Sequence, residues 1–197
     1  MSLTLSGRFI LASVSPRRLE LLSLMGLPVE VIPSGIEESF HPEETPEGHV
    51  MRLSALKAQA ASEEYPDAWV LGADTIVLVD GEVLGKPKDK EMAAQMLHKL
   101  SGREHTVFTG FTLIRQSTGY ETGRTVSSTV LFRDLSQDEV AWYVSSNEPY
   151  DKAGGYAVQG LGSFFIRAIC GSYTNVMGLP MCELVDACMQ AGMISFS

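Results

Sequence analysis

The sequence predicts an α/β protein, with a mixed twisted sheet flanked by helices and two lobes around a central cleft. Apolar segments typical of strands alternate with capped helical segments along the whole chain. Asp80-Gly81 is a strong two-residue hairpin turn, so some neighbouring strands are antiparallel and the sheet is mixed. No linker, low-complexity tract or repeat interrupts the alternation, so we expect one domain over residues 1–197.

The first elements are a strand over residues 8–12 and a helix that begins at Ser15-Pro16 and ends before Gly26. Serine is a good N-cap, proline fits the first helical turn, and glycine commonly follows the last turn. A second helix is expected from Thr45-Pro46 to about residue 62. Its predicted core-facing residues are Val50, Leu53, Leu56 and Ala60.

The middle of the chain predicts a strand over residues 69–73, which residues 75–79 either continue or pair with. The hairpin turn then leads into a strand over residues 82–84. Asp89 caps a helix that ends near Leu100. The rest of the chain predicts strands over 105–115, 125–132 and 163–169, and helices after Ser136 and over 179–190. Ser136-x-x-Glu139 is a capping box, which marks the start of the first of these helices.

Composition narrows the class of protein. The 15 Lys and Arg against 24 Asp and Glu give a net charge of −9, which disfavours a nucleic-acid binder. No apolar run is long enough for a membrane span, and the N-terminus lacks the pattern of a secretory signal. The 3 cysteines are an odd number without a C-x-x-C pair, which indicates a reducing compartment. We therefore expect a cytoplasmic protein without a membrane or nucleic-acid partner.

The segment Ser13-Val14-Ser15-Pro16-Arg17-Arg18 lies where the first strand leads into the first helix. Two arginines in a first helical turn oppose the positive end of the helix dipole. An anion bound there by the backbone N–H groups, Ser13, Ser15 and the two guanidinium groups would remove this conflict. The alternative is that both arginines point into solvent.

Asp74 interrupts an apolar β run in Gly72-Ala73-Asp74-Thr75. A carboxylate there is costly to bury unless it is paired, binds a metal or takes part in a reaction. The alternative is an aspartate in a β-turn or bulge. Lys57 and Lys86 lie near these segments, although a single lysine is most often solvated.

Two further segments contain ligand-like residues. Glu37-Glu38 forms either a solvated loop or a pair of metal ligands. The glycine-rich residues 151–162 suggest a backbone that approaches a ligand closely, although a tight loop is also rich in glycine. Together, an anion site, a poised carboxylate, scattered positive charge and a glycine-rich wall suit the hydrolysis of a phosphoanhydride.

At these residues the sequence resembles the Maf family of nucleoside triphosphate pyrophosphatases. The resemblance covers nearly the whole chain, in order. Its main blocks are Ser13-x-Ser15-Pro16-Arg17-Arg18, Gly35-Ile36-Glu37-Glu38, Arg52-Leu53 with Lys57, Gly72-Ala73-Asp74-Thr75, Gly85-Lys86-Pro87, Asp151-Lys152-Ala153-Gly154 and Gln159-Gly160-Leu161-Gly162.

The resemblance implies a fold like that of inosine triphosphate pyrophosphatases. It also implies hydrolysis of a nucleoside triphosphate to the monophosphate and pyrophosphate, assisted by Mg²⁺ or Mn²⁺. Asp74 is implied as the catalytic acid/base and Glu38, with Asp74, as a metal ligand. The implied phosphate-binding residues are Ser13, Arg17, Arg18, Lys57 and Lys86. Members of the family often form homodimers.

Three positions sort substrates within the family, and here they are Arg17, Thr75 and Gln159. This set resembles the subgroup that acts on dTTP and UTP. A glutamine can donate and accept hydrogen bonds at a pyrimidine edge, whereas a carboxylate suits a cationic methylated guanine. The alternatives are a 7-methyl-GTP pyrophosphatase of the same family and a nucleotide-sensing regulator of cell division without turnover.

Overall fold

The computed structural model describes residues 3–41 and 43–196. Its main sheet has the strand order β3-β2-β4-β6-β7-β8, with β5 paired to β4. These strands are β2 (Phe9–Leu11), β3 (Glu30–Val31), β4 (Trp69–Val79), β5 (Glu82–Leu84), β6 (Glu104–Arg115), β7 (Tyr120–Phe132) and β8 (Ile166–Cys170). β2 is parallel to β3 and β4, whereas β5 is antiparallel to β4 and β8 to β7. The mixed α/β class predicted from the sequence is confirmed.

The helices alternate with these strands along the chain. They are α1 (Pro16–Ser23), α2 (Pro46–Glu64), α3 (Lys90–Leu100), α4 (Gln137–Val144), α5 (Tyr173–Met177) and α6 (Met181–Gln190). The described residues also form the short 3-10 turns η1 (Gln116–Thr118), η2 (Pro149–Asp151), η3 (Ala153–Gly155) and η4 (Leu161–Phe165). Among the residues that the structure describes, no helix has the length and apolar character needed to cross a membrane.

Contacts along the chain define two compact units. Unit 1 comprises the described residues of Met1–Asp74, Thr109–Val126 and Gly178–Ser197. Unit 2 comprises Thr75–Phe108 and Ser127–Met177. The long strands β4, β6 and β7 each contribute one part to each unit, and the boundary in β4 falls directly after Asp74.

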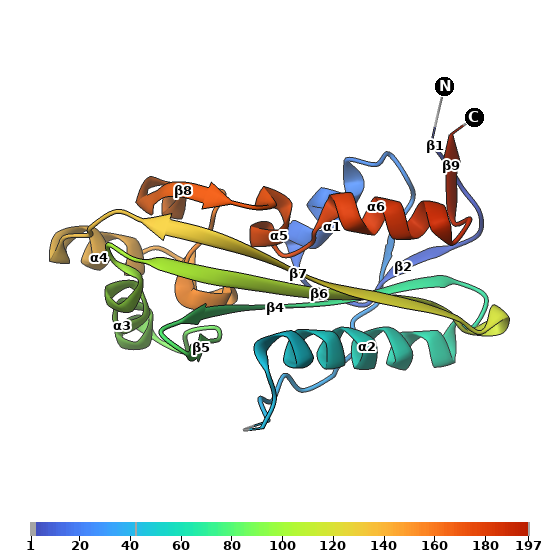
Figure 1. Ribbon diagram of the computed structural model, residues 1–197, viewed down its shortest axis with the longest axis horizontal. Coiled ribbons are helices and arrows are strands. Elements are labelled where there is room, and N and C mark those ends of the chain that lie inside the picture. The colour runs from blue at the N-terminus through green and yellow to red at the C-terminus, as the bar shows by residue number, and fades with distance from the viewer. Residues whose placement is uncertain (1–2, 42, 197) are drawn as a thin grey trace. The chain divides into compact units, whose positions relative to one another are not determined.

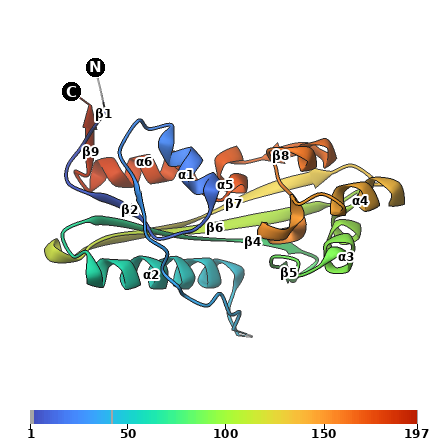
Figure 2. The same cartoon turned by 180° about the vertical axis from the view of Figure 1, so that it is seen from behind.

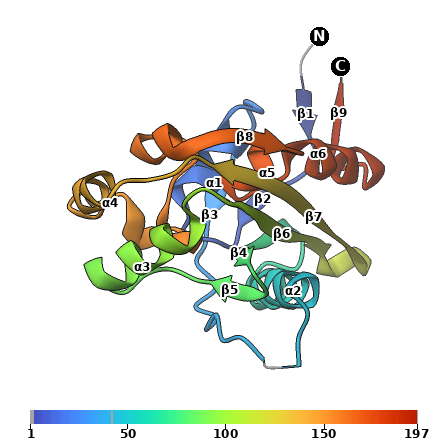
Figure 3. The ribbon, with the colours of Figure 1, turned by 60° about the vertical axis from the view of Figure 1, so that its left-hand side comes forward.

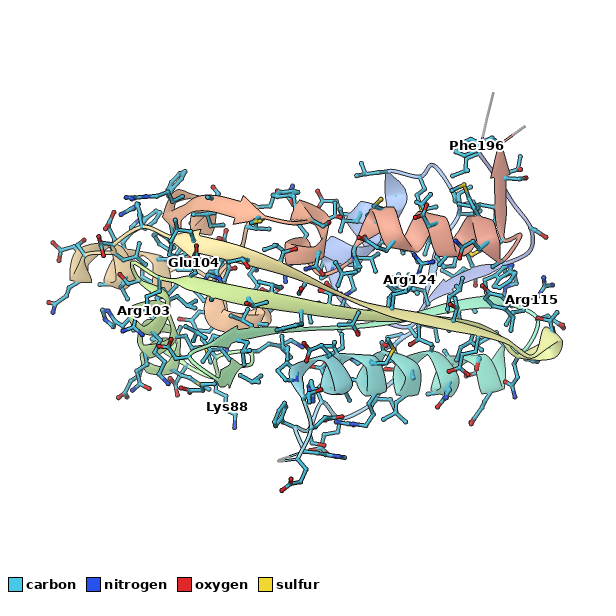
Figure 4. All side chains as sticks on the ribbon, in the orientation of Figure 1. Lys88, Arg103, Glu104, Arg115, Arg124 and Phe196 are labelled. Carbon is cyan, nitrogen blue, oxygen red and sulfur yellow. The ribbon has the colours of Figure 1, made fainter. Side chains whose placement is uncertain are left out.

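In unit 1, α2 covers one face of the strands, and α1 and α6 cover the other (Figures 1 and 2). The apolar core under α2 includes Ile10, Ala58, Ala61 and Val70. A separate antiparallel pair joins the ends of the described chain, β1 (Leu3–Leu5) with β9 (Ile194–Phe196). Arg124 Nη2 donates to Gln190 Oε1 at 3.0 Å, which links β7 to α6; Figure 4 labels Arg124.

In unit 2, α3 packs against α4 and η3; Figure 3 shows α3 beside β5, with α4 farther from that strand. The core of this unit is rich in aromatic rings. The Phe132 ring lies edge-on to those of His105 and Tyr156, and the Tyr143 ring lies edge-on to that of Phe165. From the glycine-rich residues 151–162, Tyr156 belongs to this core and Ala153 packs against it.

Several expected elements differ in detail. Residues 69–79 form one continuous strand with Asp74 within it, so residues 75–79 continue the strand over 69–73 and do not pair with it. Residues 161–165 form the 3-10 turn η4, so the strand expected over 163–169 begins only at Ile166. Leu56 was expected to face the core, but it is 37% exposed; at this part of α2 the buried positions are Leu53, Ser54, Lys57 and Ala58.

Candidate active site

Gly72 determines how closely α2 approaches β4. A Cβ on this residue would lie 2.1 Å from the carbonyl oxygen of Ser54 and 2.6 Å from the amide nitrogen of Ala58, both in the backbone of α2. Only glycine therefore fits at this crossing. Because strand side chains alternate, Asp74 projects from the same face of β4 as Gly72, toward α2. The close crossing brings Asp74 within reach of Lys57.

Lys57 lies between two carboxylates. Its Nζ donates to Asp74 Oδ1 at 2.7 Å and to Glu38 Oε1 at 2.6 Å. Lys57 is 4% exposed and Asp74 is 5% exposed. The lysine is not solvated, and the aspartate lies in a continuous strand rather than in a turn. Glu38, from the loop before α2, is partly exposed.

A second cluster of polar side chains, formed by Glu44, His49 and Arg52, reaches Asp74 through His49. The Glu44 carboxylate accepts hydrogen bonds from Arg52 Nε at 2.7 Å and Arg52 Nη2 at 2.8 Å. Glu44 Oε2 also lies 3.1 Å from His49 Nδ1. His49 Nε2, on the other side of the ring, is 3.8 Å from Asp74 Oδ2. The buried imidazole thus connects Glu44 to the candidate catalytic carboxylate.

The Arg52 guanidinium holds the pKa of Glu44 at about 2, with a smaller contribution from His49, although burial acts in the opposite direction. Glu44 is therefore ionised at neutral pH. An ionised carboxylate can only accept a hydrogen bond, so the proton on His49 Nδ1 points to Glu44 and Nε2 is the nitrogen that faces Asp74.

Arg18 is buried and belongs to the same unit. Its Nη1 donates to Ser13 Oγ at 2.9 Å, and its Nε donates to the carbonyl oxygen of Gly178 at 2.8 Å. Burial lowers the pKa of Arg18, while the charges of Asp74 and Glu38 act in the opposite direction. The alternative that this arginine points into solvent is thus excluded. Arg17, one residue earlier on α1, is partly buried.

Ser15 is the N-cap of α1, but its side chain makes no capping hydrogen bond. Ser13 Oγ instead accepts from the Ser15 amide at 3.2 Å. The first turn of α1 contains no acidic residue. These features suit the predicted anion site, which stays a prediction.

The carboxylates of Glu38 and Asp74 meet at one cationic group of the protein. Both contact one positively charged nitrogen, Lys57 Nζ, so their side chains converge on a single centre. Within residues 3–41 and 43–196 no group of three or more His, Cys, Asp or Glu side chains could hold a metal. A closed zinc site is therefore not supported, whereas Mg²⁺ needs only one or two carboxylates when phosphate and water supply the other ligands.

The remaining candidate residues belong to unit 2. Thr75 follows Asp74 directly and is partly buried, and Lys86 and Gln159 are exposed. The Gly85–Pro87 segment contacts the glycine-rich residues: the Gly154 amide donates to the Gly85 carbonyl at 3.0 Å. The segment that carries Lys86 therefore contacts Gly154, which precedes Gln159 in the same unit. The exposed Lys88, directly after Pro87, extends outward in Figure 4.

Asp74, Lys57 and Glu38 were predicted from the sequence as candidate site residues, whereas Glu44 and His49 were not. One signal was present in the helical spacing. His49 and Lys57 are two turns apart, so they share the face of α2 that meets β4. The capping threonine, Thr45, also placed Glu44 directly before the helix. Nothing in the spacing shows that His49 lies between two carboxylates.

Comparisons with known proteins agree with these observations. The model of the Maf-like protein family matches residues 8–191. The chain is 55% identical over 193 residues to a dTTP/UTP pyrophosphatase of Syntrophus aciditrophicus (strain SB), covering 98% of this chain and 94% of that protein. It is 46% identical over 187 residues to a dTTP/UTP pyrophosphatase of Syntrophotalea carbinolica, covering 94% and 85%.

Among solved structures, the chain is similar to a nucleoside-triphosphatase, a dITP/XTP pyrophosphatase from Mycobacterium abscessus. The TM-score is 0.45 at 15% identity, with 93% of this chain and 96% of that chain covered.

Proposed function

The chain belongs to the family of Maf-like proteins, and from this premise we propose that it is an enzyme that hydrolyses dTTP and UTP to the monophosphate and pyrophosphate. The observation that carries the proposal is the buried Asp74, held by Lys57 beside Glu38. Buried charge of this kind is costly for folding and is concentrated at functional sites.

In this mechanism Asp74 takes a proton from the water that attacks the α-phosphorus. The bond between the α-phosphorus and the bridging oxygen breaks, and pyrophosphate leaves. Lys57 holds the Asp74 carboxylate through Oδ1, which leaves Oδ2 as the oxygen not engaged by the lysine.

Positive charge binds the triphosphate. Arg17, Arg18 and Lys57 of unit 1, together with the Ser13 hydroxyl, supply donors for phosphate oxygens. Lys86 of unit 2 has the same proposed role. Glu38 and Asp74 would hold Mg²⁺ or Mn²⁺. Such an ion, when bound, would neutralise the negative charge on the leaving pyrophosphate.

Base selection is assigned to Arg17, Thr75 and Gln159. The Gln159 amide has both donors and an acceptor, which matches the alternating groups on the edge of a pyrimidine. An acid in this position would favour a cationic base instead.

A turnover assay tests the proposal. Purified protein with Mg²⁺ should release pyrophosphate from dTTP and UTP faster than from CTP, GTP or 7-methyl-GTP. Asp74→Asn should lower kcat by at least about a hundredfold, the usual size of a general-base contribution. The matched control is Asp67→Asn, an exposed aspartate of the same unit just before β4, which should keep full activity.

Two outcomes would contradict the proposal. Nucleotide binding without pyrophosphate release would indicate a sensor. A preference for 7-methyl-GTP would indicate the other specificity of the family.

A further inference from the structure

Gln159 lies in a loop that closes on itself. A Cβ on Gly162 would lie 2.5 Å from the carbonyl oxygen of Ala157 and 2.9 Å from its amide nitrogen. The backbones at both ends of residues 157–162 are therefore in contact, and only glycine permits that approach. Ala157 and Val158 are buried, whereas Gln159 and Gly160 are exposed. The glutamine thus occurs at the exposed part of a closed loop.

One carboxylate binds the carboxyl-terminal side of this loop. Glu148 Oε2 accepts from the Leu161 amide at 3.0 Å, and Glu148 Oε1 accepts from the Gly162 amide at 2.8 Å. Two consecutive backbone N–H groups therefore point to one carboxylate. Hydrogen bonds to an ionised acceptor are stronger than those between neutral groups.

Tyr143 joins the two sides of the loop. Its hydroxyl donates to Glu148 Oε1 at 2.8 Å and accepts from the Ala157 amide at 3.1 Å. The phenol is fully buried, with its ring edge-on to that of Phe165. Glu148 and Tyr143 thus hold the backbone on both sides of Gln159.

Only glycine fits at position 160 in this loop. Its φ of +114° is unfavourable for residues with a side chain, and a Cβ there would lie 2.4 Å from Glu148 Oε2. The residue directly after Gln159 is therefore constrained by both its own backbone conformation and the carboxylate.

We propose that Glu148 and Tyr143 are positioning residues for base selection: they fix the 157–162 loop, and with it the direction from which Gln159 meets the base. This inference rests on the proposed function, because it assumes that Gln159 reads the base. Directional hydrogen bonds from a side-chain amide discriminate only when the backbone that carries it is held. All contacts involved lie within unit 2.

Tyr143→Phe is the most informative variant. It keeps the buried ring and removes only the hydroxyl, so the Ala157 amide loses its acceptor and Glu148 loses one donor. We expect kcat/KM for dTTP and UTP to fall about tenfold, mostly through KM, as for the loss of one or two hydrogen bonds. Values for GTP should change less than about twofold, since the proposed glutamine contact is made to a pyrimidine edge.

Glu148 variants provide a graded second test. Glu148→Gln keeps one acceptor oxygen and should retain more of the dTTP preference than Glu148→Ala. The matched control is Tyr150→Phe, which removes a hydrogen bond to the Val144 carbonyl and leaves the hydrogen bonds of the Ala157, Leu161 and Gly162 amides in place. Its ratio of dTTP to GTP turnover should equal that of the wild type.

A double-mutant cycle separates positioning from a purely structural role. In a Gln159→Ala background, Tyr143→Phe should no longer change the ratio of kcat/KM for dTTP to that for GTP. The proposal is overturned if Tyr143→Phe lowers kcat/KM for all nucleotides by the same factor. It is also overturned if Tyr143→Phe changes the ratio of kcat/KM for dTTP to that for GTP equally with and without Gln159.

Failure of the proposed function is recognised separately. If the wild type releases no pyrophosphate from any nucleotide, the proposed hydrolysis is wrong, and calorimetric binding of dTTP and GTP replaces turnover. A binding preference for dTTP that Tyr143→Phe removes would still support the positioning role. No preference in the wild type, or one that Tyr143→Phe leaves intact, would overturn it.

Discussion

At the scale of single residues, the stability of the protein should depend strongly on the buried ion pair of Lys57 and Asp74. Removing one partner leaves the other charge buried and unpaired, which costs about 3–5 kcal/mol, whereas replacing both partners is far less costly. Lys57→Met should therefore lower the free energy of unfolding by about 3 kcal/mol at pH 7. The double variant Lys57→Met/Asp74→Asn should be more stable than Lys57→Met alone, as measured by urea denaturation. Strictly additive losses would contradict this account.

Glu44 offers a second prediction at this scale. Its carboxylate accepts two charge-assisted hydrogen bonds from Arg52, so Glu44→Gln should cost about 2 kcal/mol of stability at pH 7. Because the pKa of Glu44 is about 2 in the folded protein, below its ordinary 4.5, this contribution is present above pH 4.5 and is lost as the pH falls toward 2.

Chemical denaturation of wild type and Glu44→Gln at pH 7 and at pH 3 measures this change. The difference in free energy of unfolding should shrink at the lower pH. Glu47→Gln, at an exposed acid in the first turn of the same helix, is the control and should cost less than about 1 kcal/mol. An equal difference at both pH values would show that the charge of Glu44 is not the cause.

At the scale of elements, helix starts were predictable because their signals are local. Thr45, Asp89 and Ser136 each cap the helix that was expected after them, and Ser136 with Glu139 forms the capping box. Elements that depend on distant partners were not predictable. The β1–β9 pair joins opposite ends of the described chain, and η4 replaces a strand where the loop is held by Glu148.

The same contrast applies to the candidate site. An aspartate within an apolar strand was recognisable as unusual, because burial of a carboxylate is costly. Its partner was not, because Lys57 is 17 residues away and reaches it only through the crossing of α2 and β4. The position of His49 between Glu44 and Asp74 depends on the same crossing.

Gly72→Ala tests that crossing directly. The added Cβ would overlap backbone atoms of α2, which cannot rotate away as a side chain can. We expect a loss of about 3 kcal/mol in stability, at the upper end of overpacking, and a large fall in kcat because Lys57 and Asp74 are separated. Gly85→Ala is the matched control for stability, since nothing lies within 4 Å of its Cβ position. Equal melting temperatures for the two variants would contradict the close crossing.

At the scale of the whole molecule, the stability of the chain should depend on pH through one buried histidine. His105 is 3% exposed, and its Nε2 lies 2.7 Å from the Tyr156 hydroxyl. Its Nδ1 is buried and has no hydrogen-bond partner among the described residues. The Phe132 and Tyr156 rings surround the imidazole, so burial lowers the pKa of His105 to about 4.

The direction in which stability changes with pH follows from this lowered pKa. The unfolded chain binds a proton at His105 below about pH 6.5, whereas the folded chain resists it down to about 4, so stability falls as the pH decreases across this window. Between pH 7 and 5 the wild type should lose about 2 kcal/mol more than His105→Gln. His41, His49 and His98 are present in both proteins, so their contributions cancel. Urea unfolding at pH 7, 6 and 5 measures the difference, and parallel stability profiles for the two proteins would exclude a neutral buried His105.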